Sequence, residues 1–281
     1  MFKYIEIQPT DQLRDYVECF WVMKKNESYA MLDDIIIPNG SCEIVFPSGK
    51  GYLRSKDGIN FKKISEAVVI GQRDEYFLLK EFQDESVNFG VRFTPYGFEP
   101  FINHVSRITN KTEGFLNLFG ELGLNLLNEL SEHQLIEDKL KCLELFILRQ
   151  IPKLTSVNNL IKEAVCYVNQ SQGTLKVNEL IDILGTSKST LSRAFINTTG
   201  YSPKKFISIC RINYLIHYFN NNSLSLTELA YHFNYSDQSH FINDFKRYTS
   251  LNPKRYFSKN FELTDILVSE VNTRQRVYSI N

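Results

Sequence analysis

The segment from Thr186 to Phe206 reads TSKSTLSRAFINTTGYSPKKF and contains a helix whose two faces differ in kind. Leu191, Ala194 and Phe195 follow the i, i+3, i+4 spacing of a buried helical face. The opposite face carries small or hydrogen-bonding side chains: Lys188, Ser189, Ser192, Arg193 and Asn197. It lacks the glutamate–lysine pairs of an ordinary solvated helix. We therefore expect this face to meet another molecule.

The same pattern returns in residues 239–256, which read SHFINDFKRYTSLNPKRY. The two copies agree at aromatic, proline and basic positions: Phe195 with Phe245, Pro203 with Pro253, Lys204-Lys205 with Lys254-Arg255, and Phe206 with Tyr256. Each copy follows an amphipathic segment, VNELIDILGTS in the first and LTELAYHFNYS in the second. We predict Ser187 and Ser236 as N-caps, because a serine hydroxyl accepts a free backbone N–H at a helix start. Helix, tight turn, cap and second helix make a helix-turn-helix unit, so the chain is predicted to contain two such units.

The second helix of such a unit presents its outer face to the major groove of DNA. Small hydrogen-bonding side chains suit this position, since arginine pairs with guanine and asparagine or glutamine with adenine. The residues predicted to face the bases are Ser189, Ser192, Arg193, Gln238, Ser239, His240 and Asn243. The residues predicted to contact phosphates are Lys188, Lys204, Lys205, Lys246, Arg247, Lys254 and Arg255. We place Asp237 and Asp244 off the groove-facing line, and expect Arg211 to form a structural ion pair.

The segment between the two copies opens with Pro203 and has no helix breaker before Asn220. A helix of roughly 17 residues at ~1.5 Å each spans about 25 Å. With one unit at each end, it would set the two recognition helices near the ~34 Å of one DNA turn.

Charge is distributed unevenly along a chain whose formal net charge is zero. Residues 155–260 hold twelve Lys and Arg against six Asp and Glu, whereas the remainder holds twenty against twenty-six. A basic half beside an acidic half points to a polyanionic partner for the basic half.

The sequence predicts an α+β protein. Residues 1–110 contain short β-branched runs separated by Gly, Pro and charged turns, which favour an antiparallel sandwich or barrel. Residues 111–154 are Leu-rich at helical spacing and predict two amphipathic helices, the second stopped by Pro152. These helices could bridge the two halves, form a dimer surface or cover the sheet. Residues 155–260 are predicted to be all-α, and the 261–281 tail could pack on either half.

Residues 161–256 resemble the DNA-binding domain of the AraC/XylS family of bacterial transcription regulators. The resemblance rests on LAYHFNYSDQSHFINDFKRYTSLNPKRY in the second unit and LSRAFINTTGYSPKKF in the first. It implies two helix-turn-helix units on a connecting helix. Two positions depart from the family pattern. Ser250 replaces a usual glycine, which predicts a slightly strained turn, and Leu215 replaces a usual alanine in the connecting helix.

The first half resembles the sensor region of one branch of this family, through VECFWV, IIIPNGSCEIVF, VVIGQ and FGVRFTPYGF. This implies a cupin-like β-domain that binds an effector or partner and dimerises. The candidate effector contacts are Trp21, Arg73, Tyr76 and Arg92. A single tryptophan in a β-domain is also commonly plain core, so both interpretations of Trp21 stay open.

We thus expect a cytoplasmic DNA-binding transcription regulator that contacts two successive major grooves and is modulated through its first half. Its expected partners are double-stranded promoter DNA, RNA polymerase, a small-molecule or protein effector, and a second copy of the chain. The sequence leaves activation and repression open. One alternative is a DNA-free regulatory interaction module, and another is a cupin-type metalloenzyme.

Composition argues against the enzyme alternative. The five histidines show no H-x-H or H-x-x-x-H spacing, so we expect no metal site and no cofactor. The five scattered cysteines include no C-x-x-C pair and suggest a reducing compartment. The start of the chain lacks a signal-peptide pattern, and no apolar run approaches the ~18 residues of a membrane span.

Overall fold

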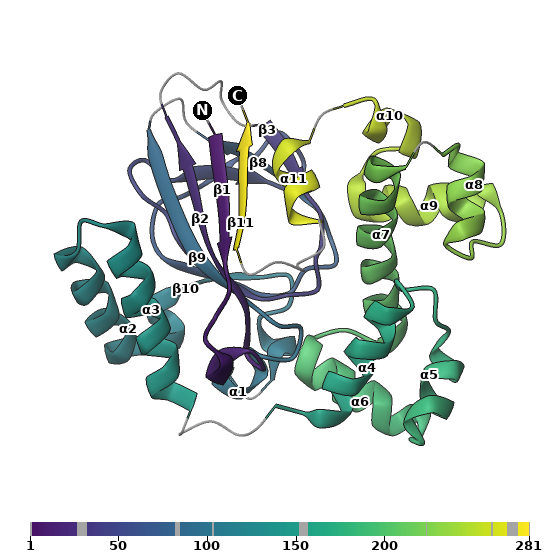
Figure 1. Ribbon diagram of the computed structural model, residues 1–281, viewed down its shortest axis with the longest axis horizontal. Helices are drawn as coiled ribbons and strands as arrows, with labels where there is room; N and C mark the ends of the chain where they lie inside the picture. Colours follow the sequence, from purple (N-terminus) through teal and green to yellow (C-terminus); the bar gives the residue numbers. More distant parts are fainter. Residues whose placement is uncertain are drawn as a thin grey trace.

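The computed structural model describes residues 2–26, 33–81, 85–102, 104–151, 157–222, 224–259, 261–268 and 275–280. A β-rich domain occupies the middle of the molecule, with a pair of helices on one side and the remaining helices on the other (Figure 1). The described parts therefore form an α+β arrangement of the kind that the strand and helix patterns predict.

The β-rich domain contains two antiparallel sheets. The larger has the strand order β10-β7-β4-β9-β2-β1-β11 and the smaller β3-β8-β5-β6. The strands are β1 (Phe2–Ile7), β2 (Val17–Lys25), β3 (Asp33–Ile36), β4 (Glu43–Phe46), β5 (Tyr52–Ser55), β6 (Lys62–Ile64), β7 (Val68–Ile70), β8 (Phe77–Glu81), β9 (Ser86–Phe93), β10 (Thr112–Gly114) and β11 (Gln275–Ile280). Short helical turns join them: η1 (Asp11–Leu13), α1 (Glu99–Ile102) and η2 (Val105–Arg107).

The larger sheet is buried on both faces, as the successive side chains of β2 show, because they enter two different hydrophobic clusters. Phe20 and Val22 enter one hydrophobic cluster, beneath the helix pair. Cys19, Trp21 and Met23 enter another, between the two sheets. Because successive strand residues point to opposite faces, a strand buried on both sides reads as a continuous apolar run, as CFWVM does here.

The helix pair α2 (Phe115–Glu132) and α3 (Ile136–Gln150) covers the outer face of the larger sheet. It lies on the side of the β-domain away from the C-terminal helices, so the interpretation as a bridge between the halves is wrong (Figure 1). The helical spacing of the sequence also places Leu122 on one apolar stripe with Phe115, Leu126 and Leu130, and this is wrong, because Leu122 is 49% exposed. Gly120 has a φ of 50° and interrupts the helix, which shifts the helical phase before Leu122. Pro152, the predicted stop of α3, lies outside the described residues.

The C-terminal helices form two units on one long helix. Their bounds are α4 (Asn159–Gln170), α5 (Val177–Leu184), α6 (Lys188–Thr199), α7 (Pro203–Asn221), α8 (Leu226–His232), α9 (Gln238–Thr249) and α10 (Pro253–Phe257). α7 runs between a unit made of α4, α5 and α6 and a unit made of α8, α9 and α10 (Figure 1). As predicted, α7 begins at Pro203, because proline fits the first turn of a helix.

The end of the chain returns to the β-domain. β11 pairs antiparallel with β1. Before it, α11 (Glu262–Leu267) lies between the β-domain and α7, in contact with β3 and α7 (Figure 1). The buried carboxylate of Asp34 holds α11: one oxygen accepts the Leu263 backbone N–H at 2.9 Å, and the other accepts the Thr264 hydroxyl at 2.9 Å.

No helix within the described part of the chain combines the length and apolar character that crossing a membrane requires.

Asp34 gives a pH-dependent test of how α11 is held. Burial raises the pKa of Asp34 from 3.8 to about 6, so the folded protein binds this proton more tightly than the unfolded chain. This difference in pKa stabilises the folded protein, fully so below about pH 4. The stabilisation is lost as the pH rises through about 6, and the free energy of unfolding falls by about 3 kcal/mol in all. Asp34→Asn should remove this component from the free energy of unfolding, measured by denaturant titration between pH 4 and 7.

Asp11→Asn, which changes an exposed carboxylate, serves as the control. Identical pH profiles for the wild type and Asp34→Asn would contradict this account of α11.

Candidate nucleic-acid interface and sensor cavities

The helices α6 and α9 begin in the same way, each capped by a side chain just before it. The Ser187 hydroxyl accepts the Thr190 backbone N–H at 3.1 Å, as predicted. At α9 the prediction of Ser236 is wrong, because the cap is Asp237, whose Oδ1 accepts the His240 backbone N–H at 2.7 Å. This hydrogen bond is the main reason why the pKa of Asp237 is lowered. A carboxylate also suits the positive end of the helix dipole, so the ionised cap is favoured.

The two helices also end in the same way. Gly200 and Ser250 both adopt the left-handed conformation, with φ of 75° and 61°. In front of each, a buried threonine hydroxyl donates to the carbonyl four residues earlier, Thr199 to Phe195 and Thr249 to Phe245, both at 2.8 Å. Serine at a position that favours glycine agrees with the strained turn expected at Ser250.

The buried and exposed faces of these helices are those that the sequence predicts. Leu191, Phe195, Phe241 and Phe245 are fully buried. Of the predicted base-facing residues, the exposed ones are Ser189, Arg193, Gln238, Ser239, His240 and Asn243, and Ser192 is half-buried. A helix whose inner face is locked in a core presents its outer face in a fixed orientation.

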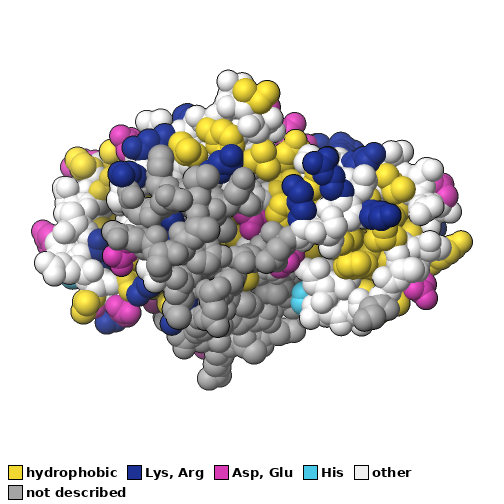
Figure 2. Space-filling view, turned by 90° about the horizontal axis from the view of Figure 1, so that it is seen from above, with side chains coloured by type: hydrophobic (Ala, Val, Ile, Leu, Met, Phe, Trp, Pro, Cys, Tyr) yellow, Lys and Arg dark blue, Asp and Glu magenta, His cyan; other side chains and the backbone are white. Residues whose placement is uncertain are grey.

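A groove of about 890 Å³ separates the two units along α7. The predicted DNA-contacting residues in its wall are Lys204, Lys205, His240, Asn243 and Arg247. The predicted residues outside its wall are Lys188, Ser189, Ser192, Arg193, Gln238, Ser239, Lys246, Lys254 and Arg255. Of these, Ser192 is half-buried and the others are exposed. Basic side chains gather on the C-terminal domain in the view from above (Figure 2).

Sequence reasoning missed the part of the groove wall that comes from the start of α5. Lys176 and Asn178 line it there, beside Ser208 of α7. Because the second helix of a helix-turn-helix unit faces the DNA, the sequence predicts no contact from α5. The lysine at the start of α5 was the available signal.

Arg211 forms the structural ion pair that the sequence predicts, and its partner is Asp244 of α9. Arg211 Nη2 lies 2.8 Å from Asp244 Oδ2, and the Tyr235 hydroxyl donates to the same oxygen at 3.0 Å. The guanidinium also lies over the Tyr235 ring, 4.2 Å from its centroid. Asp244 lines the groove between the two units, and its expected position off the line that faces the DNA bases stays a prediction. The ion pair with Arg211 offsets the charge of Asp244, so Asp244 repels an anion in the groove less strongly.

Lys205, a predicted phosphate contact, has a partner within the chain. Its ammonium pairs with Asp74, which lies in the β-domain after β7. The sequence could not show this contact, because the partner comes from a segment far away along the chain. Close by, the Asn213 side chain donates to the Pro38 carbonyl at 2.7 Å, and α6 contacts η2 and α1. The β-domain therefore holds both α6 and the connecting helix α7.

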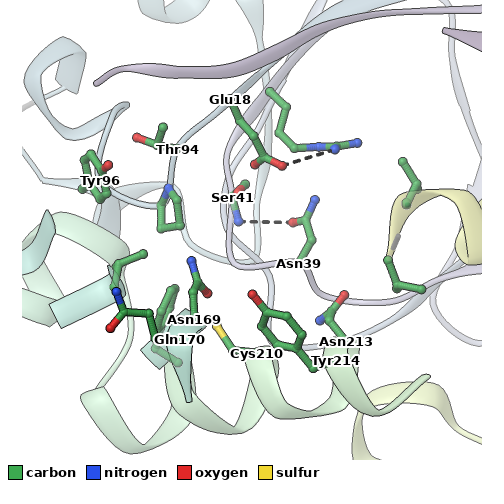
Figure 3. A pocket seen from close by; sticks show the side chains of 16 residues that line it. Glu18, Asn39, Ser41, Thr94, Tyr96, Asn169, Gln170, Cys210, Asn213 and Tyr214 are labelled. Carbon is green, nitrogen blue, oxygen red and sulfur yellow. Dashed lines mark hydrogen bonds and ion pairs between the residues drawn. The ribbon is translucent and has the colours of Figure 1, made fainter. Parts of the chain in front are cut away.

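A second cavity, of about 600 Å³, lies between the β-domain and the C-terminal helices. Figure 3 shows Asn169, Gln170, Asn213 and Tyr214 on the helix side, opposite Glu18 on the strand side. Burial raises the pKa of Glu18, which lies 3.7 Å from Arg92.

Arg92, a candidate effector contact, lines this interdomain cavity but has its own partners. Its Nε lies 3.1 Å from Glu43, its Nη1 lies 3.0 Å from Glu6, and its Nη2 donates to the Tyr4 hydroxyl at 3.0 Å. These contacts join β1, β4 and β9, so the observed role of Arg92 is to tie strands together.

A third cavity, of about 70 Å³, lies inside the β-domain and brings together two more of the candidates, Trp21 and Arg73. Tyr76 is not in its wall. It is half-buried and packs against the cluster that forms the core of the C-terminal domain. Trp21 and Arg73 therefore line one cavity, Arg92 ties strands together, and Tyr76 packs against the core of the C-terminal domain.

Two family models match this chain. Residues 180–259 match the Helix-turn-helix domain, and residues 5–113 match a domain of unknown function, DUF6597. The HTH-type transcriptional activator RhaS of Escherichia coli O157:H7 is 30% identical over 73 residues. That match spans 26% of this chain and 26% of RhaS.

Two solved structures are similar over longer stretches. ToxT from Vibrio cholerae is 16% identical, with 85% of this chain and 97% of that chain covered at a TM-score of 0.44. The C-terminal domain of AraT, a response regulator from Geobacillus stearothermophilus, is 21% identical, with 42% and 95% covered at a TM-score of 0.36.

The Arg211–Asp244 pair predicts a specific loss of stability. Asp244→Ala would leave a largely buried guanidinium without its carboxylate, at a cost of about 2–3 kcal/mol, somewhat below that of a fully buried pair. Asp182→Ala, on an exposed position of α5, should stay within about 0.5 kcal/mol of the wild type. Denaturant unfolding of the three proteins measures the difference, and equal stability of both variants would refute the bracing role of Asp244.

Proposed function

We propose that the chain is a DNA-binding transcription regulator of the AraC type, on the basis of the match of residues 180–259 to the helix-turn-helix domain and of the similarity to RhaS. We propose that α6 and α9 enter two successive major grooves of promoter DNA. The observation that carries the proposal is the repeat: two helices with matching ends, buried apolar faces and exposed hydrogen-bonding faces on one connecting helix.

The length of α7 supports contact with successive grooves. Its 19 residues extend about 28 Å at ~1.5 Å each. Since the units sit at its two ends, this length is compatible with recognition helices spaced by one DNA turn, ~34 Å. The groove between the units, with Lys204, Lys176 and Arg247 in its wall, is suited to the phosphates that separate the two major-groove segments.

We further propose that the β-domain modulates DNA binding through its hold on the first unit. The ion pair between Asp74 and Lys205 supports this, because it occupies a lysine suited to a phosphate. The contact of α6 with η2 adds to it, because it fixes the far end of a recognition helix. An effector that changed the position of the β-domain would change both contacts.

Substituting Arg193 tests base readout by α6. DNA fragments that the protein selects from genomic DNA are compared with random fragments by fluorescence anisotropy. Arg193→Ala should weaken binding to selected DNA by about 1–3 kcal/mol and relax the preference at one base pair. Lys204→Ala is the matched control: it should weaken both kinds of DNA equally and reduce the salt slope by about 1. Equal losses on both kinds of DNA for Arg193→Ala would assign it to the phosphate backbone instead.

Substituting Asp74 tests modulation by the β-domain. Asp74→Asn should release Lys205 and raise affinity for selected DNA by about threefold to fivefold, the effect of one additional surface charge pair. Glu75→Gln changes the neighbouring carboxylate, which pairs with Lys56 within the β-domain, and should leave affinity unchanged. Unchanged or weaker binding by Asp74→Asn would show that this ion pair does not restrain Lys205.

A further inference from the structure

The end of the chain joins the second helix-turn-helix unit to the β-domain. We call α11 and β11 together the strap. At the side of the second unit, the Phe261 ring before α11 lies 4.9 Å from the Tyr256 ring of α10, measured between centroids. At the side of the β-domain, β11 pairs with β1 along the whole length of both strands (Figure 1). The strap therefore has one end in each domain.

α11 has two buried faces, which enter different hydrophobic clusters. Leu263 and Ile266 are 4% and 8% exposed and enter the cluster between the two sheets. Phe261 and Val268, on either side of α11, are each 8% exposed and enter the cluster around α7. Residues three apart share one helical face, and residues seven apart share another, so the two pairs face different neighbours. α11 thus connects the core of the β-domain with the core of the C-terminal domain.

Hydrogen bonds accompany the apolar contacts on both sides of α11. Toward the β-domain, the buried carboxylate of Asp34 accepts the Leu263 backbone N–H and the Thr264 hydroxyl. Toward the C-terminal domain, the Asn220 side chain near the end of α7 donates to Asp265 at 2.8 Å. A displacement of α11 would therefore break contacts with both domains at once.

Two properties make the strap an element that can be released. α11 has six residues, whereas isolated helices shorter than about 12–15 residues are marginal in water, so α11 is stable only while it is docked. β11 lies at the edge of the larger sheet, next to β1, so it can leave without disturbing the other strand pairs. Elements of low local stability are the ones that move in conformational changes.

A docked strap opposes DNA binding on electrostatic grounds. It keeps α7 beside the β-domain, from which Asp74 pairs with Lys205. Residues 155–260 hold twelve Lys and Arg against six Asp and Glu, whereas the rest of the chain holds twenty against twenty-six. An acidic neighbour weakens the attraction of a basic domain for phosphates.

We propose that the strap is autoinhibitory: it holds α7 and the second unit beside the β-domain, and its release raises the affinity for DNA. The contacts of Lys205 and α6 with the β-domain hold the first unit, and the strap adds a restraint on the second unit. The effect on DNA rests on the proposed function, whereas the docking of the strap does not.

A proline in α11 of the full chain tests the strap. Asp265→Pro should undo α11, because it removes the backbone N–H that donates to the Phe261 carbonyl at 2.8 Å. Glu262→Pro is the matched control, because Glu262 is the first residue of α11 and proline fits that position of a helix.

The one tryptophan of the chain reports on docking in the absence of DNA. Trp21 is 6% exposed and lines the cavity between the sheets together with Leu263 and Leu267 of α11. Quenching of its fluorescence by acrylamide should increase in Asp265→Pro and stay at the wild-type level in Glu262→Pro. Quenching of Asp265→Pro at the wild-type level would overturn the docking of α11.

DNA affinity is then measured by fluorescence anisotropy on selected and random fragments. Asp265→Pro should bind both kinds about threefold to fivefold more tightly than the wild type, the scale of a surface charge pair, because the gain comes from phosphates. Increased quenching with unchanged or weaker DNA binding would overturn the autoinhibition. A wild-type chain that binds no DNA would contradict the proposed function, and quenching alone would then decide whether the strap is docked.

Asn220→Asp provides an independent test if Asp265→Pro does not fold. It places a second carboxylate against Asp265 and leaves both cores intact, so it should change quenching and DNA affinity in the same direction. Asn221→Asp is its control, because it adds the same charge at a side chain that donates to the His217 carbonyl at 2.7 Å. Equal behaviour of the two aspartate variants would contradict the role of the strap.

Discussion

The burial of α7 is the constraint on which the C-terminal domain depends. Ile209, Ile212, Leu215 and Ile216, which share one side of the helix, are at most 1% exposed, and Ile207 and Cys210 on another side are also buried. Residues of both helix-turn-helix units enter the same hydrophobic cluster as α7. A connecting helix packed in this way cannot rotate relative to either unit without opening the core. The orientation of the two recognition helices is therefore a property of the core.

The same packing extends into the β-domain. Ile35 and Ile37, on and next to β3, belong to the cluster that surrounds α7. The first unit is held by polar contacts across this junction, and α11 lies against both β3 and α7. The β-domain and the C-terminal domain thus share apolar surface as well as ion pairs. A change inside the β-domain, at Leu263 or Leu267 of α11, has a short physical route to α7.

Local chemistry made the recognition helices predictable from the sequence. The spacing of Phe195 and Phe245, the prolines and the turns all act within one or two helical turns, and the structure confirms them. The Ser236 error has a local cause too, because serine and aspartate in succession both suit an N-cap and the carboxylate took the role. The sequence alone indicated Arg73 as a ligand candidate, but it could not predict the contacts of Arg73 or the cavity that it lines.

What the sequence could not predict comes from contacts between distant segments. The pairing of Lys205 with Asp74, the position of α2 and α3 and the return of β11 to β1 all depend on tertiary packing. None of these leaves a periodic signal in one segment.

Hydroxyl-radical footprinting of the full chain on a selected genomic fragment tests the central claim most directly. If the buried connecting helix holds both recognition helices toward one duplex, two protected tracts will appear on the same face of the DNA, about 10 base pairs apart. A single protected tract, or two tracts on opposite faces of the duplex, would contradict the account.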